Sequence, residues 1–191
     1  MANVQGEQRK LCDYTQESPE ANFHALADGP GTSAMQDSAA EWRALSQCLI
    51  EAARIIARVL AKLEVGWQGE AAQRLVTTVK PFMRWLSRAS GIANDTADRI
   101  LTVKAAYETA LNAMTPLHEL QRLANEKAKL VGDNFGGINA AAIAENETTY
   151  QGHKIKNGTA RLDYVRTARE TTEQAYLFPD APTIISYIRR Y

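Results

Sequence analysis

The sequence predicts an all-α fold: an elongated helical bundle of about five helices, built on a long antiparallel helical hairpin. Between residues 42 and 114, apolar residues recur at alternating spacings of three and four, the pattern of helices that pack along their length. No segment shows the period-two alternation of a β-strand. The two apolar series, on either side of a break at residues 66–69, are Trp42, Leu45, Leu49, Ala52, Ile56, Val59 and Leu63, and then Leu75, Val79, Phe82, Leu86, Ala89, Ala93, Thr96, Ile100, Val103, Tyr107, Ala110 and Met114.

The chain before the hairpin contains a tail and one short helix. Residues 1–16 are polar and unpatterned, which predicts a flexible N-terminal tail. A short helix is expected over residues 18–27, because the Gly-Pro-Gly run at 29–31 stops any helix. The first long helix is expected to start near Ser33, which forms a capping box with Gln36 three residues later.

The break between the two long helices reads as a hinge. Gly66 is expected to close the first long helix in the left-handed conformation that glycine adopts without strain. Trp67 and Gly69 form a Trp-x-Gly motif. The tryptophan either fills the end of the hairpin as a structural residue or belongs to a functional motif, and the spacing alone does not distinguish the two. Pro81 lies inside the second long helix, which is expected to bend there and continue, because the apolar series keeps its register on both sides.

Two further helices are expected after the hairpin. Thr115 is predicted to cap a fourth helix over residues 117–131, followed by a glycine-rich loop at 132–137. A fifth helix should run from about residue 139 to about Leu177, because Pro179 and Pro182 end the helical part. The turn dipeptide Asn157-Gly158 predicts a kink or frayed turn inside it.

Composition excludes several classes of protein. The 191 residues carry 22 basic and 22 acidic side chains, a balance that gives no indication of nucleic-acid binding. Two cysteines, Cys12 and Cys48, are too few for a disulfide framework, and Cys48 is expected to be a free, buried thiol. The start of the chain has no apolar run, so no cleavable signal peptide is expected. No stretch of about 18 apolar residues predicts a membrane span.

The sequence offers no catalytic or metal-binding constellation. His24, His118 and His153 fall on different predicted elements without the spacing of metal ligands. Neither a G-x-G-x-x-G or P-loop pattern nor a G-x-S-x-G motif occurs. We therefore expect a protein that is not an enzyme, with no catalytic residue, no metal and no cofactor.

Two surfaces are candidates for binding a partner. The first helix of the hairpin carries a second apolar row beside the first, and two rows make a face too wide for one neighbouring helix, unless the fourth and fifth helices cover it. The second candidate is the tip at the end of the fourth helix, where few side chains can bury the loop's own apolar residues. The predicted partner-binding face is Ile50, Ala53, Ala57 and Leu60; the predicted tip is Leu130, Val131 and Phe135.

Several short motifs share one register over residues 17–178. They are Ser18-Pro19-Glu20 followed by Ala21-Asn22, Gly29-Pro30-Gly31, Trp67-Gln68-Gly69, Pro81-Phe82-Met83-Arg84-Trp85-Leu86, Ala106-Tyr107-Glu108, Pro116, Asn134-Phe135-Gly136-Gly137-Ile138-Asn139, and Ala142-Ile143-Ala144 through Tyr150. Together they resemble the PPE family of mycobacteria and related actinobacteria. The departures are Ser18 in place of the first proline, Lys154 in place of a common tryptophan, and Gly136 where some members have a second aromatic residue. With no long repetitive region after the helices, the chain resembles the short, stand-alone members.

The resemblance implies a function. PPE-like residues 17–178, followed by a short tail at 179–191, would pair with a two-helix PE-family protein in a four-helix bundle. The heterodimer would be secreted or carried to the cell surface by a type VII secretion system, with Trp67 and Gly69 as the hinge or secretion motif. A cytosolic chaperone would hold the tip before export, with Phe135 either as an anchor or folded back as a plug between the helices.

Two alternatives remain open. A self-associating helical adaptor or scaffold, unconnected with secretion, would use the same apolar face; an enzyme with a site between helices has little support. Tyr176 and Asp180 form a Tyr-x-x-x-Asp pair like the secretion signal of type VII substrates. In PE–PPE pairs that signal normally lies on the PE chain. In addition, Pro179 lies between the two residues and prevents them from sharing one face of a helix. The pair is therefore expected to be a coincidence.

Overall fold

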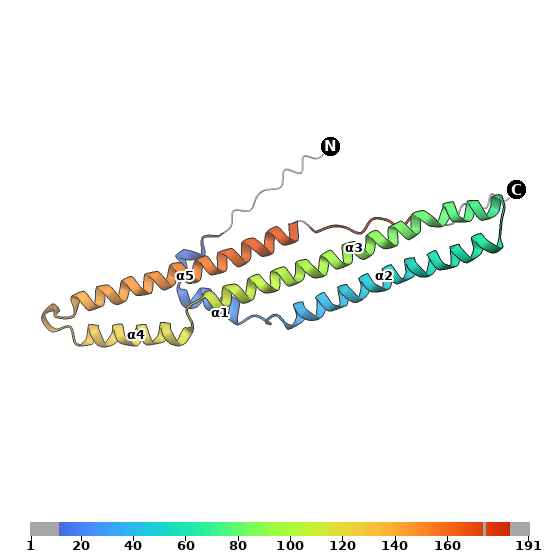
Figure 1. The fold of residues 1–191 in the computed structure, drawn as a ribbon. Coiled ribbons are helices and arrows are strands. Elements are labelled where there is room, and N and C mark those ends of the chain that lie inside the picture. Colours follow the sequence, from blue (N-terminus) through green and yellow to red (C-terminus); the bar gives the residue numbers. More distant parts are fainter. Residues whose placement is uncertain (1–11, 174, 184–191) are drawn as a thin grey trace, which may run out of the picture. The chain divides into compact units, whose positions relative to one another are not determined.

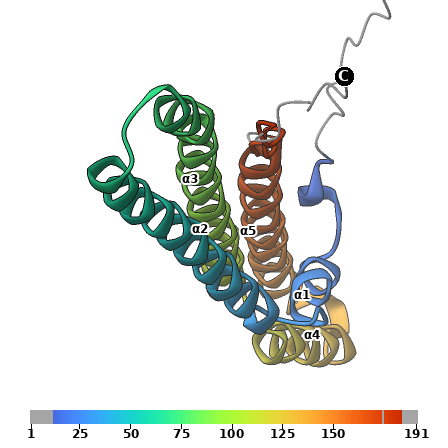
Figure 2. The same ribbon diagram turned by 90° about the vertical axis from the view of Figure 1, so that its right-hand side faces the viewer.

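A computed structural model describes residues 12–173 and 175–183, and over these residues it confirms the all-α prediction. No strand occurs in the described part of the chain. Residues 1–11 of the predicted N-terminal tail and 184–191 of the predicted C-terminal tail lie outside the described residues. The α-helices and 3-10 turns (Figures 1 and 2) are η1 Tyr14–Gln16, α1 Pro19–Ala27, α2 Ser33–Gly66, α3 Glu70–Ala113, α4 Leu117–Gly132, η2 Phe135–Gly137 and α5 Ala140–Glu173.

The chain divides into two compact units, and α3 belongs to both. The first unit contains the residues up to Ser33 together with Thr102–Glu173; it comprises η1, α1, the end of α3, α4 and α5. The second contains Ala34–Leu101 and the segment after Glu173; it comprises the rest of α2 and α3 and the extended residues 175–183.

In the second unit, α2 runs antiparallel to α3 (Figure 1) and contacts it through small residues. Ala39 and Ala53 on α2 are almost completely buried, as are Ala93 and Ala97 on α3. The Ser90 hydroxyl of α3 donates to the Ser46 carbonyl of α2 at 2.9 Å. The residues of α2 that share this face, here called the inner row, are Ala39, Arg43, Ser46, Ile50, Ala53, Ala57 and Leu60.

The inner row contains the four predicted partner-binding residues, and the structure places them beside α3, where Ile50, Ala53 and Ala57 line an open groove; their role in binding a partner stays a prediction. Ala53 and Leu60 are buried, at 6% and 7% exposure. Ile50 and Ala57 are half-buried. The physical reason is side-chain size, since four of the seven residues in the inner row are alanine or serine and let the two helix backbones approach, whereas six of the seven residues in the first apolar series are large. The spacing of three and four is the same in both rows and does not distinguish them.

The hinge differs from the prediction at one glycine. Gly66 is the last residue of α2, and Gly69, with a φ of 112°, has the positive φ predicted for Gly66. The Trp67 amide donates to the Leu63 carbonyl at 2.7 Å, and the Gln73 amide donates to the Gly69 carbonyl at 3.2 Å. The Trp-x-Gly spacing therefore leaves two residues between the helices before glycine makes the turn. As predicted, α3 continues through Pro81.

In the first unit, α1, α3 and α5 share a small core. Leu26, Ala110, Met114 and Ala160 are buried together, with Phe23, Tyr107, Leu111 and Tyr164 packed against them. The Tyr107 hydroxyl donates to the Leu26 carbonyl at 2.7 Å, and its ring meets Tyr164 edge-on at a centroid distance of 5.6 Å. The end of α1 is thereby fixed to α3 and α5.

Three predictions for this unit are wrong. Helix α5 is continuous through residues 157–158, and it ends at Glu173 rather than near Leu177. Asn157 and Gly158 are buried and pack against η1 and α1. Thr115 does not cap α4, whose N-cap is Pro116; instead its amide donates to Asn157 Oδ1 at 2.7 Å. Tertiary contacts thus replace the local turn and cap that these residues favour on their own.

Candidate protein interaction surfaces

Several large apolar side chains of the second unit are exposed on α2, to one side of the inner row. Except for Leu63 at its end, each residue of what we call the lateral row stands one position before a residue of the inner row, a rotation of about 100° around the helix. Leu45, Val59 and Leu63 of this row are 41%, 50% and 37% exposed, and the neighbouring Ile55 is 49% exposed. The lateral row is the first apolar series of the sequence: Trp42, Leu45, Leu49, Ala52, Ile56, Val59 and Leu63.

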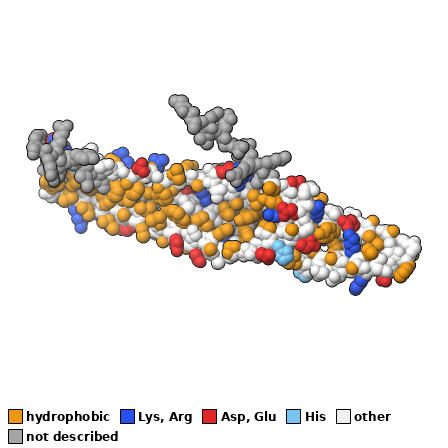
Figure 3. Space-filling model, turned by 180° about the vertical axis from the view of Figure 1, so that it is seen from behind, with side chains coloured by type: hydrophobic (Ala, Val, Ile, Leu, Met, Phe, Trp, Pro, Cys, Tyr) orange, Lys and Arg blue, Asp and Glu red, His pale blue; other side chains and the backbone are white. Residues whose placement is uncertain are grey.

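Helix α3 places three apolar residues beside the lateral row, of which Trp85 is half-buried whereas Ala89 and Ile92 are buried. In an antiparallel pair, positions shifted in the same sense from the contact row of each helix lie on the same side of the pair. Trp85, Ala89 and Ile92 are shifted in this way from the contact residues Leu86, Ser90 and Ala93. Figure 3 shows hydrophobic side chains spread over the α2–α3 part of the surface. We call the lateral row and these α3 residues together the lateral face.

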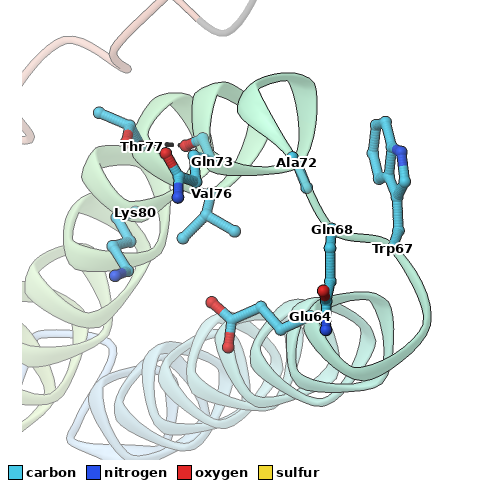
Figure 4. A pocket seen from close by; sticks show the side chains of 9 residues that line it. Glu64, Trp67, Gln68, Ala72, Gln73, Val76, Thr77 and Lys80 are labelled. Carbon is cyan, nitrogen blue, oxygen red and sulfur yellow. Dashed lines mark hydrogen bonds between the residues drawn. The ribbon is translucent and has the colours of Figure 1, made fainter.

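The hinge carries one exposed aromatic side chain. Trp67 is 43% exposed, and its ring turns away from the space between the two helices, whereas Glu64 and Val76 point into that space (Figure 4). An open, unfilled pocket lies there, and Trp67 borders it together with Gln73 and Lys80. Trp67 therefore does not fill the end of the hairpin. The function of the Trp-x-Gly motif in secretion stays a prediction.

Helices α4 and α5 form the tip of the first unit. Leu120 and Leu123 are buried, and Asn146 Nδ2 donates to the Leu123 carbonyl at 3.1 Å. Lys127 forms an ion pair with Glu147 across the two helices, and its hydrogen bond lowers the pKa of that carboxyl group. These contacts hold the ends of the helices on either side of the loop.

The loop itself is closed by two asparagines and leaves its apolar residues outside. The Asn139 amide donates to Asn134 Oδ1 at 2.8 Å, and Asn139 Nδ2 donates to the Leu130 carbonyl at 3.1 Å. Phe135 is 79% exposed, so it does not fold back as a plug between the helices. Leu130 is half-buried, while Val131 is exposed. Ile138, at 76% exposure, belongs to the same surface. The sequence did not predict this role, because the residues around Ile138 form a loop without periodic apolar spacing.

The Tyr-x-x-x-Asp pair lies in the extended segment 175–183, not on a helix. Tyr176 is exposed, and Arg99 of α3 lies over its ring with the guanidinium carbon 5.4 Å from the centroid. Asp180 is exposed, on the far side of Pro179. The two side chains thus do not share a helical face, and a role in export stays untested.

The N-terminal Ser-Pro-Glu motif is structural in this chain. Ser18 caps α1, with its hydroxyl accepting the Ala21 amide hydrogen at 3.1 Å, so serine in place of the first proline supplies a helix cap. Pro19 is buried, and its carbonyl accepts from Asn157 Nδ2 at 2.9 Å. The carboxylate of Glu20 accepts the Tyr150 hydroxyl hydrogen at 3.0 Å. Burial and this hydrogen bond raise the pKa of Tyr150 to about 12.

Chemistry-bearing groups are scattered over the described residues. His153 contacts the Thr115 hydroxyl at 2.8 Å, and His24 pairs with Asp28 at the end of α1. Within residues 12–173 and 175–183, no three His, Cys, Asp or Glu side chains are grouped closely enough to hold a metal ion. Cys48 is a free thiol but is exposed on α2, not buried as predicted. None of the described helices has the length and hydropathy needed to cross a membrane.

The fold and its surfaces define a class: a helical protein whose described residues present apolar surfaces at the lateral face, the hinge and the tip. The family model of the PPE family matches residues 13–176, and the chain belongs to that family. It is similar to three proteins of Mycobacterium tuberculosis strain H37Rv. It is 31% identical over 175 residues to the uncharacterized PPE family protein PPE19, 34% identical over 169 residues to PPE37, and 34% identical over 168 residues to PPE2. These alignments cover 91%, 88% and 87% of this chain but 44%, 36% and 30% of the relatives, so the chain spans less than half of their length.

Proposed function

We propose that this chain is a non-enzymatic interaction protein that pairs with a PE-family helical hairpin through the lateral face. The observation that carries the proposal is the set of large apolar side chains of the lateral row that are exposed on α2, namely Leu45, Val59 and Leu63. A two-helix partner packed along them would complete a four-helix bundle. Obligate pairs of this kind commonly bury more than about 2,000 Å² of mostly apolar surface. The chain produced alone should therefore be poorly soluble.

Co-expression with PE-type hairpins from the host genome tests the pairing. Light scattering during size-exclusion chromatography should give the mass of one chain plus one hairpin. A homodimer of this chain would instead support the self-associating scaffold, which uses the same face. A soluble monomer that captures no hairpin would refute both functions.

Export by a type VII secretion system, with a chaperone on the tip, is the second part of the proposal. Phe135 and Ile138 are exposed on a loop whose backbone is fixed by hydrogen bonds from Asn139, and Val131 is exposed at the end of α4 beside it. Exposed aromatic residues on a rigid loop are typical anchors for a partner's pocket. The heterodimer would be held in the cytoplasm by the chaperone and then delivered outside the cell or to its surface.

The Phe135→Ala heterodimer tests the tip. Chaperone binding measured by co-purification should fall at least tenfold, while the thermal unfolding midpoint of the heterodimer stays unchanged. Ala141→Ser, at an exposed position at the start of α5, is the control and should bind as wild type does. Undiminished chaperone binding by Phe135→Ala would remove the tip from the proposal.

A further inference from the structure

Residues 175–183, here called the strap, lie on the lateral face. The ring of Phe178 stacks on Trp42 of α2 with a centroid distance of 6.1 Å and an interplanar angle of 18°. The Trp85 indole N–H of α3 donates to the Pro179 carbonyl at 2.7 Å. Tyr176 and Leu177 border a small pocket with Ile92. The strap therefore covers one end of the lateral face, and Ile55, Val59 and Leu63 remain exposed near the hinge.

Over the described residues, the contacts that hold the strap are individually weak. Pro179 and Pro182 favour an extended backbone, so the strap forms no helix of its own. Leu177 is 91% exposed and Phe178 is 41% exposed, so the strap buries mainly one aromatic ring against the helices. A stacked ring pair, one indole hydrogen bond and the Arg99 contact with Tyr176 are each weak interactions at a partly exposed site. A segment attached in this way can be released without unfolding α2 or α3.

We propose that the strap is an intrachain cap, which shields Trp42 and Trp85 before pairing and which the partner hairpin displaces. The inference rests on the proposed pairing through the lateral face. The partner would cover the two tryptophans with its own apolar side chains and take over the area now occupied by Phe178. Only chains whose strap is released can bind the hairpin. The cap therefore lowers the apparent affinity in proportion to the fraction of chains in the released state.

The first test measures pairing of the full chain, fused to a soluble carrier, with a PE-type hairpin. Tyr176→Ala combined with Phe178→Ala removes both ring contacts of the strap and should bind on the order of tenfold more tightly than wild type. Leu177→Ala changes an exposed neighbour in the same segment and should bind as wild type does. Unchanged or weaker binding by the double variant would overturn the cap, since the strap would then be irrelevant or part of the interface.

The second test follows chymotrypsin cleavage within residues 175–178. Cleavage of the wild-type strap should accelerate when the hairpin binds, because the cap is released; slower cleavage in the complex would overturn the proposal. If no variant of the chain binds any hairpin, the proposed pairing is refuted. Cleavage of the unbound chain then tests the contact between the strap and the helices independently of pairing. Faster cleavage after Tyr176 in Phe178→Ala than in wild type then supports the contact with Trp42, and equal rates refute it.

Discussion

Among the described glycines, Gly158 leaves the least room for a side chain. A Cβ atom built there would lie 2.6 Å from Thr15 Cα and 2.7 Å from the Tyr14 carbonyl oxygen, both backbone atoms of η1. No side chain can turn aside to make room. In Gly158→Ala, η1 must therefore move away from α5, which disturbs the Tyr14 ring where it lies 4.0 Å from the Arg161 guanidinium carbon.

The magnitude follows from two opposing effects. Alanine in place of glycine inside a helix contributes about 0.5–1 kcal/mol of stability. Overpacking against a backbone typically costs about 1–3 kcal/mol. Gly152→Ala, in the same helix, gains the first effect alone, because nothing lies within 4 Å of its Cβ position. Since the helix term is common to both variants, their difference isolates the overpacking cost.

Urea unfolding followed by circular dichroism measures that difference. Gly152→Ala should unfold at a higher urea concentration than wild type, and Gly158→Ala should have a free energy of unfolding about 1–3 kcal/mol below that of Gly152→Ala. If both variants are stabilised equally, η1 does not pack on Gly158 and the account of a continuous, glycine-dependent α5 is refuted.

Three further predictions concern stability. Asn157→Ala leaves the Thr115 amide and the Pro19 carbonyl buried without this partner and should lower the free energy of unfolding by about 2–4 kcal/mol, whereas Asn125→Ala on the exposed side of α4 should change it by less than about 0.5 kcal/mol. The raised pKa of Tyr150 favours its protonated form in the folded state, so its stabilising contribution is complete below pH 10 and is lost as the pH rises through about 12. Unfolding midpoints across that range should therefore fall more steeply for wild type than for Tyr150→Phe, and equal slopes would contradict this assignment. Gly69→Ala should destabilise the hinge by about 1–2 kcal/mol in chemical unfolding, because its φ of 112° strains any side chain; an unchanged midpoint would show that the turn can adopt another conformation.

Much of the secondary structure follows from local sequence. The apolar spacing, Gly29-Pro30-Gly31 and the Trp-x-Gly motif place α1, α2 and α3 within a few residues of their observed ends. The loop at 132–137 and its exposed Phe135 follow from the glycines, which offer little side chain to cover an aromatic ring. These features depend on interactions within a few residues, so a single sequence contains the information.

The rest depends on contacts between distant residues. Both rows on α2 have helical spacing, and only the small partners Ser90, Ala93 and Ala97 on α3 determine that the inner row packs there. Asn157-Gly158 has the local preferences of a turn, but η1 and α1 convert it into a packing site 138 residues away from Pro19. The strap has no periodic signal, since its position depends on single contacts with Trp42 and Trp85.

The central claim is that the lateral face binds a PE-type hairpin, and a charge placed on that face tests it most directly. Val59→Asp combined with Leu63→Asp introduces two carboxylates at partly exposed positions, so the chain itself should keep its helicity. Ala61→Asp, between them in sequence but on the opposite side of α2, is the matched control. An unpaired charge buried in an interface costs about 3–5 kcal/mol. Co-purification of the hairpin should therefore fall at least 100-fold with the double variant and remain at the wild-type level with Ala61→Asp; a double variant that still recovers the hairpin at the wild-type level would contradict the account.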